Sequence, residues 1–155
     1  LHGYPYVWDV VADRVERSPA VVRLLGYEPD EVPADSAWWR DRVHPDDLAH
    51  TRAVIQSALA DPAVRRTEAE YRVRHRDGSW RLVCDRARVV HDAEGRTVAL
   101  VGVTTDQTEL RTRETRLREA EWAARADTER LQRLSAALTP ALTSGEVTDV
   151  VVRHL

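Results

Sequence analysis

The hydrophobic and polar positions of this chain change their period several times, and each period predicts a different element. Alternation with a period of two is typical of strands, and it recurs in five segments. Asp77-Gly78 separates two of them, and Asp-Gly between alternating apolar residues is a strong hairpin signal. The strands are expected at residues 4–10, 14–17, 66 up to the Asp77-Gly78 turn, 80–90 and 98–105.

Short helices are expected between the second and third strands. Ser18 followed by Pro19 is typical of a helix start, and Gly26 is typical of its end. Asp35 or Ser36 is expected to cap a second short helix, which carries the tryptophans of residues 38–39.

The longest helix of this part is expected to begin at residues 44–47, His-Pro-Asp-Asp, where two carboxylates meet the positive end of the helix dipole. The positions that share its apolar face are Leu48, Thr51, Ile55, Ala58 and Leu59. This face is expected to be core. Strands, then short helices, then a three-stranded meander predict an antiparallel α+β domain over residues 1–107.

A long charged helix is predicted after Thr108. Leu110, Leu117, Ala124, Leu131 and Leu138 recur every seven residues, which is typical of a coiled coil, although the companion seam is apolar only at its end. Thr139-Pro140 is expected to interrupt the helix, so the connector is assigned to residues 108–142. Trp122 lies off the seam, where a large exposed aromatic side chain indicates a contact surface.

Composition narrows the function classes. All 23 basic residues are arginine and the net charge is −3, with acidic residues interleaved, so no one-sided basic field for nucleic acid is expected. The single cysteine excludes an internal disulfide and favours a reducing cytoplasm. No apolar stretch is long enough for a membrane span. The absence of methionine indicates a fragment of a longer protein.

An ordered set of motifs resembles a known family. The set comprises Trp8-Asp9, Ser18-Pro19, Leu25-Gly26-Tyr27, Val43 to Asp47, Glu70-Tyr71-Arg72, Asp77-Gly78, Trp80-Arg81, Gly95, Gly102 and Asp106-Gln107-Thr108-Glu109. In this order and spacing they resemble a PAS domain of the subtype common in bacterial signalling proteins, over about residues 4–109. The resemblance implies a five-stranded antiparallel sheet with helices over one face, a ligand or cofactor pocket, and a signal that leaves through a C-terminal helix, commonly in a dimer.

Residues beyond the connector resemble the beginning of a second sensory module. Thr143 to Glu146 is typical of a capping box that begins another helix. Residues from about 131 to 155 resemble the opening of a GAF domain, and the start of this domain is assigned to residues 143–155. The two resemblances together imply a parent protein that is a histidine kinase of a two-component system, a PP2C-type serine phosphatase or a cyclic-dinucleotide enzyme. The catalytic parts of such a parent would lie outside this chain.

Some PAS domains hold a flavin or a haem through particular residues. A flavin photoadduct needs a cysteine on a helix, whereas Cys84 falls on a predicted strand, which argues against it. Haem needs an inward histidine on the long helix, and His50 is expected to point to solvent. The identity of any cofactor stays open. His44, Asp46 and Asp47 are interpreted as helix capping rather than a metal site, and the sequence contains no catalytic constellation.

Two groups of residues are candidates for function. A ligand pocket is expected among Trp38, Trp39, Leu48, Ile55, Tyr71 and Val73, although for the tryptophans a core role is the alternative. A signal relay is expected at Asp106, Thr108 and Arg81, through an ion pair between Asp106 and Arg81, with a helix cap alone as the alternative.

Two functions remain open. The first is a cytoplasmic, non-catalytic sensor that relays the state of a small-molecule ligand through its C-terminal helix. The second is a ligand-free PAS module that dimerises its parent through the connector helix and the sheet or N-terminus. A co-purified small molecule favours the first, and a ligand-free homodimer favours the second.

Overall fold

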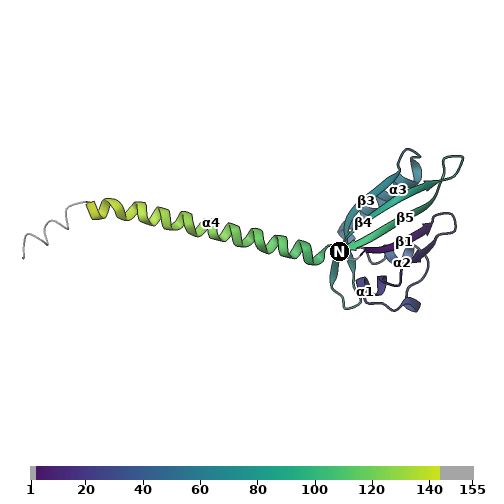
Figure 1. The fold of residues 1–155 in the computed structure, drawn as a ribbon, viewed down its shortest axis with the longest axis horizontal. Coiled ribbons are helices and arrows are strands. Elements are labelled where there is room, and N and C mark those ends of the chain that lie inside the picture. The colour runs from purple at the N-terminus through teal and green to yellow at the C-terminus, as the bar shows by residue number, and fades with distance from the viewer. Residues whose placement is uncertain (1–2, 144–155) are drawn as a thin grey trace, which may run out of the picture. The chain divides into compact units, whose positions relative to one another are not determined.

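The computed structural model describes residues 3–143, and the chain divides into two units at Leu110. The first unit contains one five-stranded antiparallel sheet (Figure 1). Its strands are β1 (Gly3–Asp9), β2 (Arg14–Arg17), β3 (Arg66–Arg74), β4 (Trp80–His91) and β5 (Thr97–Asp106). Their order across the sheet is β2-β1-β5-β4-β3, so the two chain-terminal strands β1 and β5 are central neighbours. The predicted α+β fold and all five predicted strands are confirmed.

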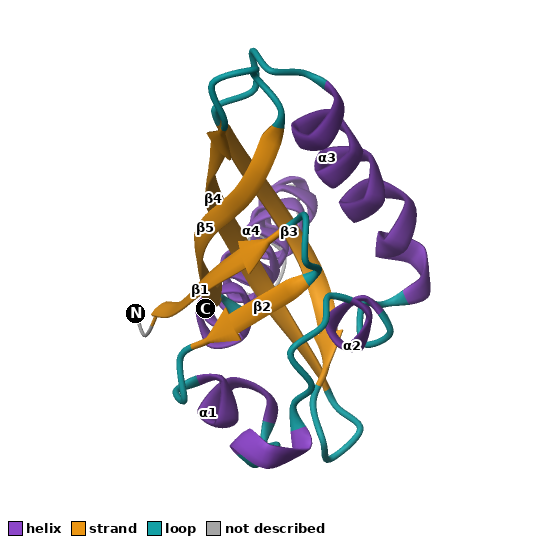
Figure 2. Cartoon of the chain, turned by 90° about the vertical axis from the view of Figure 1, so that its right-hand side faces the viewer, coloured by secondary structure: helices purple, strands orange, loops and turns teal. Residues whose placement is uncertain are grey.

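The helices between β2 and β3 lie over one face of this sheet (Figure 2). They are α1 (Val21–Leu25), α2 (Ala37–Arg40) and α3 (Leu48–Ala60), with 3-10 turns η1 (Pro29–Glu31) and η2 (Pro45–Asp47) between them. The core lies between the helices and the sheet, where the fully buried side chains include those of Leu24, Leu25, Val73, Val83 and Leu100, while Cys84 is fully buried on the opposite face of the sheet. Burial of these apolar side chains supplies the main driving force for the layered arrangement.

Helix α1 begins later than the sequence predicts. Ser18 Oγ accepts a hydrogen bond from the N–H of Ala20 at 3.3 Å, but the helix starts only at Val21, after a turn through Pro19. The predicted end is correct, because Gly26 adopts a φ of +74°, which costs a glycine little. The second cap is also correct, since Asp35 Oδ1 accepts from the N–H of Trp38 at 2.8 Å.

The Asp-Gly hairpin joins β3 to β4 as predicted. Its loop spans residues 75–79, and the N–H of His75 donates to the carbonyl of Ser79 at 2.8 Å. Gly78 has a φ of +87°, and Asp77 Oδ1 accepts from the N–H of Ser79 at 2.8 Å. The turn residues thus fix the register in which Arg74 pairs with Trp80.

The start of α3 differs from a simple capped helix. A 3-10 turn comes first, in which His44 Nδ1 accepts from the N–H of Asp46 at 3.2 Å. Asp47 caps no N–H with its side chain, because its carboxylate binds Arg72 on β3 instead. Leu59 was predicted in the buried stripe but is 40% exposed, since it lies at the edge of the apolar face near the helix end.

The second unit continues helix α4 (Thr108–Thr143), which begins in the first unit. The helix runs through Pro140, so the predicted interruption at Thr139-Pro140 is wrong; a proline removes one backbone hydrogen bond without obliging the helix to end. The heptad leucines Leu110, Leu117 and Leu131 are exposed, as is Trp122. The predicted GAF-like segment lies outside the described residues apart from Thr143.

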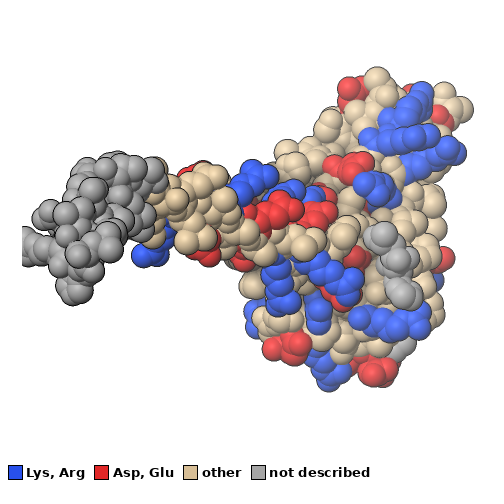
Figure 3. Space-filling model, turned by 60° about the vertical axis from the view of Figure 1, so that its left-hand side comes forward, with Lys and Arg blue, Asp and Glu red and all other residues tan. Residues whose placement is uncertain are grey.

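The surface carries both signs of charge. Arginine side chains are interspersed with aspartate and glutamate on the face drawn in Figure 3, in line with the mixed charge pattern of the sequence. Within residues 3–143, no helix combines the length and the apolar character required to cross a membrane.

Candidate functional site

A cavity of about 280 Å³ lies between the sheet and helices α2 and α3. Its walls are mostly apolar and aromatic, and the aromatic side chains that line it are Tyr4, Tyr6, Trp8, Trp39 and Tyr71. The volume is at the lower end of the range for small-molecule sites, and apolar walls with a few polar groups are typical of such sites. The cavity is therefore sized for a small organic molecule.

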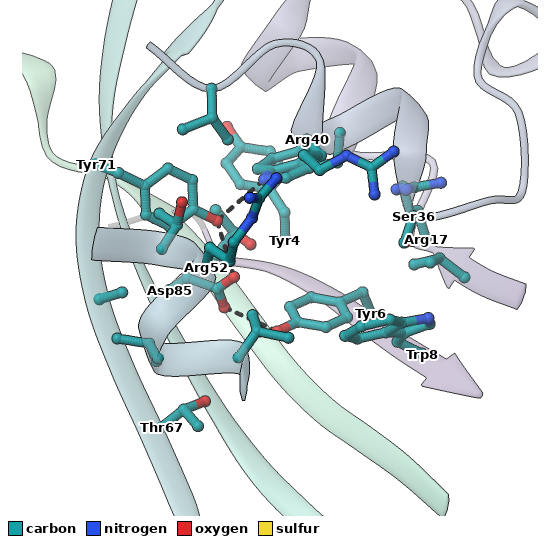
Figure 4. Close-up of a pocket in the computed structure, with 18 of the residues that line it drawn as sticks. Tyr4, Tyr6, Trp8, Arg17, Ser36, Arg40, Arg52, Thr67, Tyr71 and Asp85 are labelled. Carbon is teal, nitrogen blue, oxygen red and sulfur yellow. Dashed lines mark hydrogen bonds between the residues drawn. The ribbon is translucent and has the colours of Figure 1, made fainter. Parts of the chain in front are cut away.

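Asp85 on β4 is the acidic group of this cavity (Figure 4). Its Oδ1 accepts a hydrogen bond from the Tyr6 hydroxyl and its Oδ2 accepts one from the Tyr71 hydroxyl, each at 3.0 Å. The Tyr71 oxygen in turn accepts from Trp39 Nε1 at 3.0 Å. A connected polar group, which we call the Asp85 group, thus comprises Asp85, Tyr6, Tyr71 and Trp39, drawn from β4, β1, β3 and α2.

The strand order brings the members of this group together. Tyr71 lies on β3, next to β4, whereas Tyr6 lies on β1 and must reach across β5. Gly102 of β5 is paired with Tyr6, and a Cβ at this position would lie 2.6 Å from the phenol oxygen of Tyr6. Glycine therefore leaves the space through which the Tyr6 ring extends to Asp85.

Burial sets the protonation of the Asp85 group. It raises the pKa of Asp85 to about 6, while the hydrogen bonds from Tyr6 and Tyr71 act in the opposite direction. Burial also raises the pKa of both tyrosines, and the neighbouring Asp85 charge adds to the effect. At neutral pH the two phenols therefore keep their protons and donate them to a carboxylate that is largely ionised.

Four of the six predicted pocket residues line the cavity: Trp39, Leu48, Ile55 and Tyr71. Trp38 and Val73 do not, and both are buried in the core instead. Their ligand role therefore has no geometric support.

Trp38 and Trp39 point in different directions because successive side chains of a helix diverge by about 100°. Trp38 packs edge-on against Tyr27, with ring centroids 5.3 Å apart, and the Arg42 guanidinium lies 3.8 Å from the Trp38 ring centre. Trp39 turns toward the cavity, where its indole N–H meets Tyr71. The prediction that only one of the pair could face the core fully is consistent with this geometry.

Sequence reasoning missed Asp85 and Tyr6. One signal was present: Asp85 shares its alternating strand face with Val83, Ala87 and Val89, and a lone acid on an apolar strand face needs a buried partner. The alternation of Tyr4, Tyr6 and Trp8 also places three aromatic side chains on one face of β1. That these two features meet depends on the strand order, which local patterns do not contain.

The predicted relay residues lie where β5 passes into α4. Asp106 Oδ1 accepts from the N–H of Thr108 at 2.8 Å, which is a helix cap. Thr108 Oγ1 accepts from the N–H of Leu82 at 2.9 Å, and the N–H of Gln107 donates to the Leu82 carbonyl at 2.8 Å. Both backbone groups of Leu82 on β4 are thus bound to the residues that begin the helix.

The predicted ion pair between Asp106 and Arg81 is not formed among the described residues. The Asp106 carboxylate serves as a cap, which was the alternative, and Arg81 Nε is buried with no hydrogen-bond partner in the described part of the chain. Arg81 lies on the adjacent strand, as expected, but the register pairs Asp106 with Val83, two residues beyond Arg81.

The residues weighed for cofactors and metals lie outside the cavity lining. Cys84 is buried on β4, on the face opposite its neighbour Asp85, with its sulfur 3.7 Å from Glu68 Oε1. His50 is exposed on α3. Asp47 Oδ1 and Oδ2 bind Arg72 Nη2 and Nε at 2.8 and 2.9 Å. Across the described residues, histidine, cysteine and acidic side chains form no cluster suited to a metal ion.

Comparisons with known proteins agree with this architecture. The family described as PAS fold matches residues 14–104. The White collar 2 protein of Neurospora crassa is 34% identical over 79 residues, which cover 48% of this chain and only 14% of that protein.

Solved structures give the same result. A sensory box histidine kinase/response regulator from Burkholderia thailandensis E264 superposes with a TM-score of 0.65 at 27% identity, over 80% of this chain and 91% of the other. The N-terminal domain of a diguanylate cyclase with PAS/PAC sensor from Marinobacter aquaeolei gives 0.64 at 26% identity, over 71% and 99%.

Proposed function

Because the chain belongs to the PAS family, we propose that it is the ligand-responsive sensory module of a larger bacterial signalling protein. In this proposal a small molecule occupies the cavity, and its presence changes the start of helix α4. The observation that carries the proposal is the position of β4. This strand contributes Asp85 to the cavity and, three residues away, Leu82 to the helix start.

The relay we propose uses the contacts around Leu82. A ligand that displaces β4 at Asp85 also displaces Leu82, because a strand held on both sides by backbone hydrogen bonds moves as a unit. Leu82 is bound to Gln107 and Thr108, and Thr108 is capped by Asp106, so the displacement reaches the first turn of α4. The ligand must bind one arrangement more tightly than the other for this to shift the equilibrium.

Arg81 is the third proposed relay residue. It precedes Leu82 on β4, and its buried Nε lacks a hydrogen-bond partner within the described residues. Because it adjoins Leu82, a displacement of β4 at Leu82 also moves Arg81.

We further propose the setting of the module. Its parent is a cytoplasmic histidine kinase, PP2C-type serine phosphatase or cyclic-dinucleotide enzyme; sensory domains of a histidine kinase and a diguanylate cyclase are among the similar structures. This chain supplies regulation rather than catalysis. The parent is a homodimer in which α4 pairs with its copy through Leu110, Leu117, Ala124 and Leu131.

Native mass spectrometry of freshly purified protein tests the ligand. We expect a non-covalent adduct of small mass, and we expect it to disappear in Ala69→Leu, because Ala69 lines the cavity and a larger side chain fills it. Ala53→Leu is the matched control, since Ala53 is exposed on α3 and lies outside the cavity lining. No adduct in any preparation, or an adduct that survives Ala69→Leu, contradicts ligand binding in this cavity.

Amide hydrogen exchange tests the relay. If the cavity communicates with α4, Ala69→Leu changes the exchange rate of the Leu82 amide, and this change is absent in a Thr108→Val background, which lacks the hydroxyl acceptor. Thr128→Val, later in the same helix, should leave the change intact. Equal behaviour of the two threonine variants refutes the relay.

A second function is favoured by one observation. Leu117 and Leu131 of α4 are 65% and 66% exposed, which is typical of a helix that pairs with a partner. A ligand-free module that only dimerises its parent would use the same leucines. Sedimentation distinguishes the two functions, since a stable dimer without bound small molecule favours dimerisation alone.

A further inference from the structure

The cavity presents one full negative charge among aromatic rings. Within the described chain, Asp85 is the only acidic side chain in the lining. A carboxylate offers about four lone-pair positions, and the phenols of Tyr6 and Tyr71 use two of them. The remaining positions are available to a donor that enters the cavity.

The arginines of the lining are engaged elsewhere or solvated. Arg17 donates to the carbonyls of Pro33 and Asp35 at 2.7 and 2.9 Å, so its guanidinium is held away from the carboxylate. Arg40 and Arg52 are exposed, and solvent and salt screen their charges. No arginine of the described lining is therefore paired with Asp85, whose charge is left without a neighbouring cation.

From this geometry we propose that the ligand is a small organic cation, an amine with an apolar body. This step rests on the proposed sensory function and names the ligand class of the same cavity. The ammonium group binds the free lone pairs of Asp85 through charge-assisted hydrogen bonds. The faces of Tyr6, Trp8, Trp39 and Tyr71 surround the apolar body and attract the cation through their quadrupoles.

An anion or a purely apolar ligand fits these walls less well. An anion would face the Asp85 carboxylate at close range, where repulsion is weakly screened. An apolar ligand would bury that carboxylate further without a new hydrogen bond, which is costly. The cation alone compensates the desolvation that the buried acid suffers.

The proposal predicts a pH dependence. The titratable and charged side chains that face Asp85 across the cavity are Tyr4, Tyr6, Arg17, Arg40, Arg52 and Tyr71. Tyrosine and arginine side chains ordinarily titrate only above about pH 10. Affinity for an amine should therefore fall as the pH drops through the titration of Asp85, and no other lining group in the described chain accounts for such a fall.

Three probes of similar size test the ligand class: 2-phenylethylamine, 2-phenylethanol and 3-phenylpropanoate, titrated calorimetrically into the full chain at pH 7.5. We expect the amine to bind at least tenfold more tightly than the alcohol, and the acid to bind most weakly. Asp85→Asn should weaken the amine about tenfold and leave the alcohol nearly unchanged. Trp8→Leu, outside the Asp85 group, should also weaken the amine more than the alcohol, which keeps the test decisive if Asp85→Asn folds poorly.

The outcomes separate the two proposals. Suppose that the alcohol binds in the cavity but the amine binds no more tightly, or that Asp85→Asn and Trp8→Leu each weaken the amine and the alcohol equally. The proposal of a cationic ligand is then wrong, whereas the proposal that the cavity binds a ligand is retained. If none of the three probes binds, the cavity itself is not a ligand site and both proposals fail. If the acid binds more tightly than the amine, the proposed positive charge of the ligand is wrong.

Discussion

Asp85 and Asp47 are two carboxylates whose pKa values the fold moves in opposite directions. Asp85 receives hydrogen bonds from two neutral phenols, and burial raises its pKa to about 6. Asp47 receives two from the Arg72 guanidinium and one from the Arg72 backbone, and these lower its pKa to about 2.

The difference lies first in burial, which dominates at Asp85, and then in the hydrogen-bond partner, which dominates at Asp47. A guanidinium compensates the loss of water around a carboxylate with a full charge, whereas a phenol supplies only a dipole. Its bonds to Arg72 thereby make Asp47 a structural link between the start of α3 and strand β3. The buried charge of Asp85 is not compensated by a positive group of the described chain, and an ionisable side chain in this condition is typical of a functional site.

The largest expected effect that separates the two carboxylates is the pH dependence due to Asp85. Its raised pKa means that the folded protein binds more protons than the unfolded chain between about pH 4 and 6. The free energy of unfolding should therefore fall by roughly 2 to 3 kcal/mol as the pH rises through this window. Asp85→Asn should remove this fall, as measured by urea unfolding at successive pH values. A profile that is unchanged in the variant rules out the raised pKa.

Gly102→Ala should disrupt the hydrogen bond from Tyr6 to Asp85, although Gly102 makes no side-chain contact with Asp85. The new Cβ meets the Tyr6 ring, so we expect a loss of about 1 to 3 kcal/mol of stability, as for overpacked cores. The same substitution in a Tyr6→Ala background should cost much less, because the obstructing ring is gone. Equal costs in both backgrounds would show that the ring is not the cause.

Tyr6→Phe sharpens the comparison by removing one donor. The Tyr6 hydrogen bond lowers the pKa of Asp85, so its loss should raise this pKa above 6 and cost about 1 kcal/mol at neutral pH. The carboxyl carbon resonance of Asp85 in an NMR titration reports the change. Tyr4→Phe is the matched control, since Tyr4 also lines the cavity but makes no hydrogen bond to Asp85.

Asp47→Asn should have the smallest effect, because the Arg72 side chain is 39% exposed and water replaces part of the lost interaction. Its pH signature has the opposite sign. The depressed pKa of Asp47 stabilises the fold above about pH 4, and this stabilisation is lost as the pH falls from about 4 to about 2. Unfolding at these pH values should show the loss in the parent chain and not in the variant.

The fold could be predicted from sequence because its signals are local. The Asp77-Gly78 turn and the strand alternation each determine structure within a few residues, and the ordered motifs supplied the topology by resemblance. The errors fall where local signals compete. Pro140 predicts that the helix ends there, but the helix continues through it. Asp47 is predicted to cap a helix, but its side chain binds Arg72 instead.

The candidate site was only half predictable. Trp39, Tyr71, Leu48 and Ile55 were placed correctly because helix and strand periodicity determine which side chains point inward. Asp85 was missed because its partners come from β1 and β3, and only the strand order brings them to β4. Contacts between polar side chains that are far apart in the sequence produce no periodic pattern from which they could be predicted.

The crossing of Gly102 by Tyr6 has a mechanical consequence. The hydroxyl of Tyr6 and the carboxylate of Asp85 form a brace that spans β5 and ties β1 to β4, although these strands share no backbone ladder. Such a brace resists flattening of the twisted sheet without engaging a single backbone group.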